Sequence, residues 1–148
     1  MHLSNDFLLD TGIILRHLRN DRRAHDLLDH LEKLGEITVS AVTYMEILIG
    51  CRPSEEDATL LFFDRVHPVT ITPEIAYKAA SLIKRYPAAF GKDNPRGFPD
   101  ALIAATAWHK ESALVTLNTR HFANVQISEL ETQIINQNSP NWVSTLKT

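Results

Sequence analysis

The sequence has 148 residues, of which 44% are hydrophobic and 22% are charged, as expected for one folded domain rather than a disordered chain. No apolar run approaches the ~20 residues of a membrane-spanning helix, and the N-terminal segment lacks the features of a signal peptide. A single cysteine excludes an internal disulfide and a cysteine-based zinc cluster. The net charge of −3 argues against a broadly basic nucleic-acid coat. We therefore expect a cytoplasmic protein without a membrane partner.

Short apolar runs alternate along the chain with longer amphipathic segments. The expected strands cover residues 7–9, 37–40, 69–71 and 113–117, with a last short strand at 125–127. The expected helices cover residues 11–18, 21–34, 41–50, 53–66, 75–86 and 101–110. Residues 87–97, which contain two Pro and two Gly, are expected to form a loop.

This alternation predicts an α/β fold. Strands that are separated by helices favour a central parallel sheet with right-handed crossovers and helices on both faces. We expect a single domain over residues 1–130. Residues 131–148 then form a C-terminal tail that is either loosely ordered or docked through Trp142 and Val143.

Three acids stand among apolar neighbours: Asp10, Glu46 and Asp100. A carboxylate in such a setting is partly desolvated and needs a cation, a metal or a proton. Asp10 ends the first expected strand, Glu46 lies in the helix after the second, and Asp100 lies in the first turn of its helix. Since ligands bind at the carboxyl ends of parallel strands, the three could share one crevice and hold Mg²⁺ or Mn²⁺. The alternative for Asp10 and Asp100 is simple helix capping.

Four segments together resemble the signature segments of PIN-domain ribonucleases of the VapC toxin type. They are LLDTGIIL, SAVTYMEILIG, FPDALIAATA and LVTLNTRHF, and their order and spacing match over about residues 7–125. The resemblance implies an α/β fold and Mg²⁺- or Mn²⁺-dependent hydrolysis of RNA, leaving a 5′-phosphate and a 3′-hydroxyl. It also implies that Asp10, Glu46 and Asp100 bind the metal and that Asn118 takes a fourth catalytic position.

The remaining site residues follow from the same resemblance. Because Asn118 is uncharged, three ionised ligands remain, and both one-metal and two-metal chemistry stay open. Thr11 and Thr116 are expected to donate hydrogen bonds that orient the carboxylates. Arg120 and Arg96 are expected to contact RNA phosphates, and the alternative for each is an ordinary exposed arginine.

Three other classes of protein compete with this interpretation. The triplet Asp10-Thr11-Gly12 occurs in retroviral-type aspartic proteases, but that fold is mostly β and leaves Glu46 and Asp100 without a role. A haloacid-dehalogenase phosphatase would carry a second Asp where Gly12 stands. A PIN-like module that only binds RNA or a protein stays open because of Asn118.

The resemblance also implies a homodimer and a small antitoxin that covers the active-site groove. Two observations agree with such partners. An acidic cluster is a natural receptor for an inhibitory arginine. Several apolar side chains near the site exceed what one side of a thin sheet is expected to bury, and exposed apolar area usually marks a contact surface. These side chains are Ile13, Leu27, Leu31, Tyr44 and Ile47.

Overall fold

The computed structural model describes residues 5–91, 97–117 and 126–147. These residues form a five-stranded sheet in the order β3-β2-β1-β4-β5, and each pair of neighbouring strands is parallel. The strands are β1 (Phe7–Leu9), β2 (Ile37–Ser40), β3 (Pro68–Val69), β4 (Ala113–Thr116) and β5 (Thr132–Ile134). The predicted α/β fold with a central parallel sheet is confirmed.

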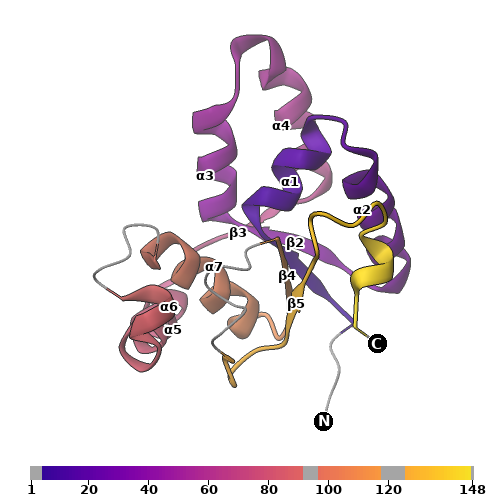
Figure 1. Ribbon diagram of the computed structural model, residues 1–148. Helices are drawn as coiled ribbons and strands as arrows, with labels where there is room; N and C mark the ends of the chain where they lie inside the picture. The colour runs from indigo at the N-terminus through magenta and orange to yellow at the C-terminus, as the bar shows by residue number, and fades with distance from the viewer. Residues whose placement is uncertain (1–4, 92–96, 118–125, 148) are drawn as a thin grey trace.

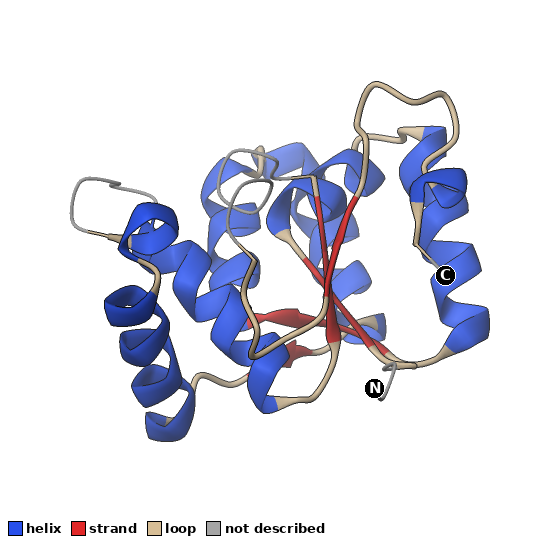
Figure 2. Ribbon diagram, turned by 60° about the horizontal axis from the view of Figure 1, so that its bottom comes forward, coloured by secondary structure: helices blue, strands red, loops and turns tan. Residues whose placement is uncertain are grey.

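Helices cover both faces of this sheet (Figures 1 and 2). They are α1 (Thr11–Leu18), α2 (Arg22–Leu34), α3 (Ala41–Gly50), α4 (Glu56–Arg65), α5 (Pro73–Arg85), α6 (Pro87–Phe90) and α7 (Gly97–His109). Two short 3₁₀ turns, η1 (Pro53–Glu55) and η2 (Val143–Thr145), complete the described elements. Figure 1 shows α5 and α6 on one side of the strands and α2 on the other, with α3 and α4 extending together from one end.

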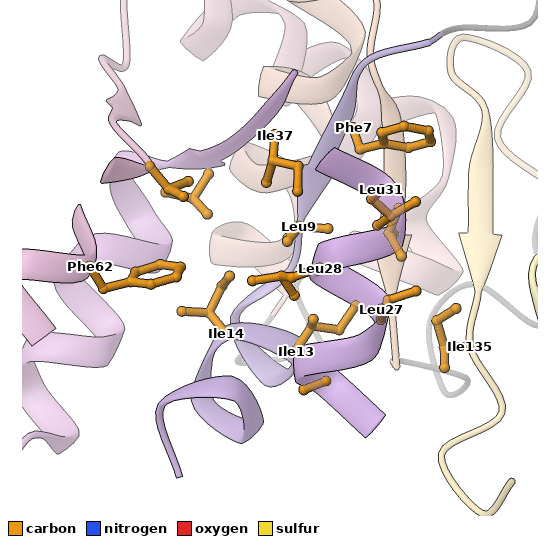
Figure 3. Close-up of a cluster of buried hydrophobic side chains, with 14 of the residues drawn as sticks. Phe7, Leu9, Ile13, Ile14, Leu27, Leu28, Leu31, Ile37, Phe62 and Ile135 are labelled. Carbon is orange, nitrogen blue, oxygen red and sulfur yellow. The ribbon is translucent and has the colours of Figure 1, made fainter. Parts of the chain in front are cut away.

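The alternation of side chains along the central strand divides the core into two clusters. Phe7 and Leu9 of β1 face the cluster that contains residues of α1, α2 and α4, which Figure 3 shows in close-up. Leu8 faces the opposite cluster, which contains residues of α5, α6 and α7. All three side chains of β1 are buried, as expected for a parallel strand covered on both sides.

Side-chain caps fix the starts of the helices that follow β1 and β2. Asp10 caps α1, and Ser40 caps α3 by accepting a hydrogen bond from the amide of Val42. Asp21 caps α2 and accepts a hydrogen bond from the amide of Arg23. These caps place the first turns of α1 and α3 directly at the carboxyl ends of their strands.

The C-terminal segment packs against α2. β5 adds a parallel strand to β4, and Trp142 lies in the core cluster with no exposed surface. The guanidinium of Arg23 in α2 lies 4.7 Å from the centre of the Trp142 ring and donates to the carbonyl of Gln137 at 2.7 Å. Residues 131–147 therefore contribute a strand and a large core side chain to the fold.

The structure corrects several expected details. Residues 87–90 of the expected loop form α6, because Pro87 takes the first position of a helical turn. Of the strand expected at 125–127, residues 126 and 127 lie in no strand, and Val125 lies outside the described residues. The sheet instead continues with β5, and the strand expected at 69–71 is the shorter β3.

The expected excess of exposed apolar area near the site is also wrong for the side chains that suggested it. Ile13, Leu27, Leu31 and Ile47 are buried in the core, and Tyr44 is partly buried against it. The sheet is not thin on this side, since α4 and the C-terminal segment cover α1 and α2. The large exposed apolar residues of α3 and α4 are different ones: Met45, Ile49, Leu60 and Leu61.

Candidate active site

Asp10 lies at the topological switch point of the sheet. The chain leaves β1 toward β2 on one side and later returns to place β4 on the other side. In parallel sheets, the crevice between two such strands is where ligands bind. The Asp10 amide donates to the carbonyl of Val115 in β4 at 3.0 Å, so the carboxyl ends of both strands are joined at this residue.

The carboxylate of Asp10 is buried, with 8% of the residue exposed, and accepts two short hydrogen bonds. The amide of Thr11 donates to Oδ1 at 2.7 Å, and this bond caps α1. The hydroxyl of Thr116, the last residue of β4, donates to Oδ2 at 2.5 Å. Asp10 therefore does cap α1, as the alternative interpretation expected. The cap uses only Oδ1, and Oδ2 accepts from Thr116.

Glu46 reaches the same place from α3. The hydroxyl of Thr11 donates to Oε1 of Glu46 at 2.7 Å. Thr11 therefore contacts both carboxylates, that of Asp10 through its backbone amide and that of Glu46 through its side chain. A third hydroxyl, that of Thr43, lies 3.0 Å from the Thr11 hydroxyl.

Asp100 lies in the first turn of α7 and is partly buried. Only three residues separate the end of α7 from the start of β4, so α7 ends near the amino edge of the sheet. Because α7 packs along β1 and β4 and must return antiparallel to β4, its first turn lies toward the carboxyl edge, where β1 and β4 end. Asp100 therefore lies toward the end of the sheet that carries Asp10.

The other three predicted site residues, Arg96, Asn118 and Arg120, lie outside the described residues. In the described residues, the sequence reasoning missed Thr43. A buried hydroxyl in an apolar helix carries no distinctive pattern, and its partner Thr11 is 32 residues away in the sequence. The proximity of Thr43 to Glu46, three positions apart on one helix face, was the available signal.

The donor set fits a hard divalent ion in its chemistry. Asp10 and Glu46 offer carboxylate oxygens, and hydroxyl and amide donors orient them, as is usual around metal-binding carboxylates. Within the described parts of the chain, no three Asp, Glu, His or Cys side chains lie together in an arrangement that could hold a metal ion. The three-acid site of Asp10, Glu46 and Asp100 therefore stays a prediction, founded on the carboxylates of Asp10 and Glu46, which both accept hydrogen bonds from Thr11.

A cavity in the described residues lies elsewhere. It has a volume of about 360 Å³ and lies near the junction of α7 and β4, with Trp108, Ser112 and Glu129 among its lining residues. This junction is at the amino edge of the sheet, so the cavity lies away from Asp10.

None of the helices in the described ranges has the length and apolar character that a membrane span requires.

The comparison with protein families agrees with this geometry. The family model described as PIN domain matches residues 7–127. The chain belongs to the PIN-domain family. This membership excludes the retroviral-type protease and the haloacid-dehalogenase phosphatase, neither of which has this domain.

Individual relatives show to which group of the PIN family the chain belongs. The chain is 39% identical to Ribonuclease VapC19 of Mycobacterium tuberculosis over 118 residues, which are 78% of this chain and 90% of that protein. It is 37% identical to Ribonuclease VapC10 of the same species, over 78% of this chain and 84% of the relative. The chain is thus a PIN-domain protein of the VapC group.

Solved structures of toxin–antitoxin complexes have the same fold. A chain of a toxin-antitoxin complex from Klebsiella pneumoniae matches with a TM-score of 0.67 and 26% identity, over 84% of this chain and 98% of the other. A chain of VapBC2 from Rickettsia felis, bound to a promoter DNA fragment, matches with a TM-score of 0.70 and 22% identity, over 87% and 98% of the two chains.

Proposed function

We propose that this protein is a divalent-metal-dependent endoribonuclease and the toxin of a toxin–antitoxin pair. The observation that carries the proposal is the pair of carboxylates on Asp10 and Glu46, which Thr11 joins at the β1–β4 switch point of a PIN domain. Two relatives with 37% or more identity are named ribonucleases, and structural neighbours are toxin–antitoxin complexes.

The residues of the site then have distinct tasks. Asp10, Glu46 and Asp100 would hold Mg²⁺ or Mn²⁺, and Asn118 would take the fourth catalytic position. The ion, when bound, neutralises the charge that develops on the phosphate during hydrolysis and lowers the pKa of an attacking water. Thr11 and Thr116 hold the two carboxylates in place through the hydrogen bonds described above. Arg96 and Arg120 contact the phosphates that flank the cleaved bond.

Cleavage of RNA by the purified protein, with and without added metal, tests this function. We expect cleavage in Mg²⁺ or Mn²⁺, none in EDTA, and loss of cleavage in the variants Glu46→Gln and Asp100→Asn. Asp64→Asn is the matched control, because Asp64 also has apolar neighbours in the sequence but is exposed on α4. RNA cleavage that continues undiminished in EDTA would contradict the proposal.

The same proposal includes a small antitoxin and a homodimer as partners. Structural neighbours are toxin–antitoxin complexes, and an arginine of an antitoxin could pair with the acids of the site. Helices α3 and α4 contact each other and carry exposed apolar residues that could form the dimer interface. Ile49 is 77% exposed and Leu61 is 70% exposed.

Light scattering on the wild type and on the double variant Ile49→Lys/Leu61→Lys tests the homodimer. We expect a dimer for the wild type and a monomer for the double variant, with RNA cleavage assayed in parallel. Expression from an inducible promoter should arrest bacterial growth, and Asp10→Ala should relieve the arrest. A monodisperse wild-type monomer that causes no growth arrest would refute both the dimer and the toxin role while leaving the nuclease proposal intact.

A further inference from the structure

The hydroxyl of Thr43 differs from those of other buried helical threonines in this protein. In α7, the hydroxyl of Thr106 donates to the carbonyl of Leu102 at 2.7 Å, four residues back along its own helix. In α4, Thr59 bonds to the carbonyl of Glu55 in the same way. A buried threonine hydroxyl in a helix usually donates in this way to a carbonyl of the preceding turn. The Thr43 side chain is fully buried as well, yet its hydroxyl lies 3.0 Å from the side chain of Thr11 on another helix.

The direction of the bond between the two hydroxyls follows from counting protons. A threonine hydroxyl has one proton to donate, and an ionised carboxylate can only accept. The Thr11 proton is used on Oε1 of Glu46 at 2.7 Å. Thr43 must therefore donate to Thr11. The result is a directed chain of hydrogen bonds from Thr43 to Thr11 to Glu46.

These hydrogen bonds connect two residues of α3 through Thr11 of α1. Thr43 and Glu46 lie three positions apart, so their side chains are neighbours on one face of the helix. Thr11, the first residue of α1, bridges them and also bonds to Asp10 through its amide. A hydroxyl that accepts a hydrogen bond is polarised and becomes a better donor to its own acceptor. Thr43 thus strengthens the bond that holds the carboxylate of Glu46 to Thr11.

We propose that Thr43 is a positioning residue of the metal site, which acts through Thr11 to fix the carboxylate of Glu46. This inference rests on the proposed function, because it assigns Thr43 a part in metal binding. Without the Thr43 hydroxyl, the Thr11 hydroxyl loses its donor and Glu46 regains rotamer freedom that metal binding must then remove. The loss of such outer partners commonly lowers metal affinity or activity by about 10- to 100-fold.

The test compares three variants of the full chain. Thr43→Val keeps the shape of the side chain and removes the hydroxyl, whereas Thr43→Ser keeps the hydroxyl. Thr106→Val is the matched control, because it removes an equally buried hydroxyl that bonds only to the backbone of its own helix. Binding of Mn²⁺ to the apo protein, followed by electron paramagnetic resonance, measures metal affinity without any reliance on cleavage.

We expect Thr43→Val to weaken Mn²⁺ binding about 10-fold or more and Thr43→Ser and Thr106→Val to bind like the wild type. The Mn²⁺ concentration for half-maximal RNA cleavage should rise by the same factor in Thr43→Val, with KM for RNA unchanged at saturating metal. In a Glu46→Gln background, Thr43→Val should have no further effect on binding. Thr43→Ala, which cannot overpack the site, provides the same comparison if the valine variant does not fold.

Two results would overturn the inference. One is wild-type Mn²⁺ affinity in Thr43→Val or Thr43→Ala, and the other is a Thr43→Ser variant as impaired as Thr43→Val. Failure of the proposed function looks different, because the wild-type protein itself would then bind no Mn²⁺ and cleave no RNA. The two failures are therefore distinguishable in one set of measurements.

Discussion

Replacing Asp10 separates its role in capping α1 from its role in the active site. In Asp10→Asn, the amide oxygen can still accept from the amide of Thr11, and the amide nitrogen then faces the hydroxyl of Thr116. That hydroxyl can rotate to accept instead of donate. Asn and Asp are comparable N-caps, so the free energy of unfolding should change by only about 0.5 kcal/mol. Metal binding should nevertheless fail, because a ligand charge is lost.

Asp10→Ala removes both roles at once. Loss of the cap costs about 0.5–2 kcal/mol, and loss of the hydrogen bond from the Thr116 hydroxyl costs about 1 kcal/mol more. We therefore expect a fall of about 2 kcal/mol in the free energy of unfolding for Asp10→Ala and nearly none for Asp10→Asn, measured by urea unfolding without metal. Both variants should lose RNA cleavage by at least about 100-fold. A stable Asp10→Asn variant that still cleaves RNA would refute the reasoning, because Asp10 would then be only a cap.

Three further predictions follow from other contacts. Burial and the nearby His25 lower the pKa of His17 to about 4, below its ordinary 6.5, so between pH 6.5 and 4 the unfolded chain takes up a proton that the folded chain does not. Stability should be full above pH 6.5 and fall by about 1–3 kcal/mol toward pH 4, and His17→Gln should flatten this dependence in urea unfolding at a series of pH values. Trp142→Ala should cost about 3–5 kcal/mol by the same method, because the side chain is fully buried. Thr116→Val should weaken Mn²⁺ binding about 10-fold or more in a titration of the apo protein, because it removes a donor to Asp10.

The sequence predicts the fold class well because the central strands are buried on both faces. The residues of β1 and β4 are short apolar runs between amphipathic helices, and this pattern has few alternative folds. The acids at Asp10 and Glu46 are predictable for a related reason, since a charge in an apolar segment must be compensated. Their hydrogen-bonded arrangement depends on Thr11 and Thr43, and the contact of two hydroxyls from different helices depends on packing that no local pattern specifies.

The C-terminal segment shows a second limit of local reasoning. β5 consists of Thr132, Gln133 and Ile134, whose pattern is too short and too polar to predict a strand. It pairs with β4 because the edge of β4 is available there, which is a property of the sheet and not of the segment. Trp142 is recognisable in the sequence as a residue that needs burial, but only the structure gives α2 as the surface that receives it.

The incorrect expectation about apolar surface also came from local reasoning, which does not show which elements pack together. Its correction changes where a partner is expected to bind. Counting apolar residues on α1, α2 and α3 assumes that one layer covers the sheet, whereas Phe62 of α4 and Trp142 of the C-terminal segment belong to the same core cluster. The apolar residues near the sheet are therefore used by the fold. Those left for a partner lie farther along the chain on α3 and α4, where Ile49 and Leu61 are the most exposed apolar side chains of these two helices. Since Glu46 also lies on α3, a partner bound to this helix pair would contact an element that positions the active site.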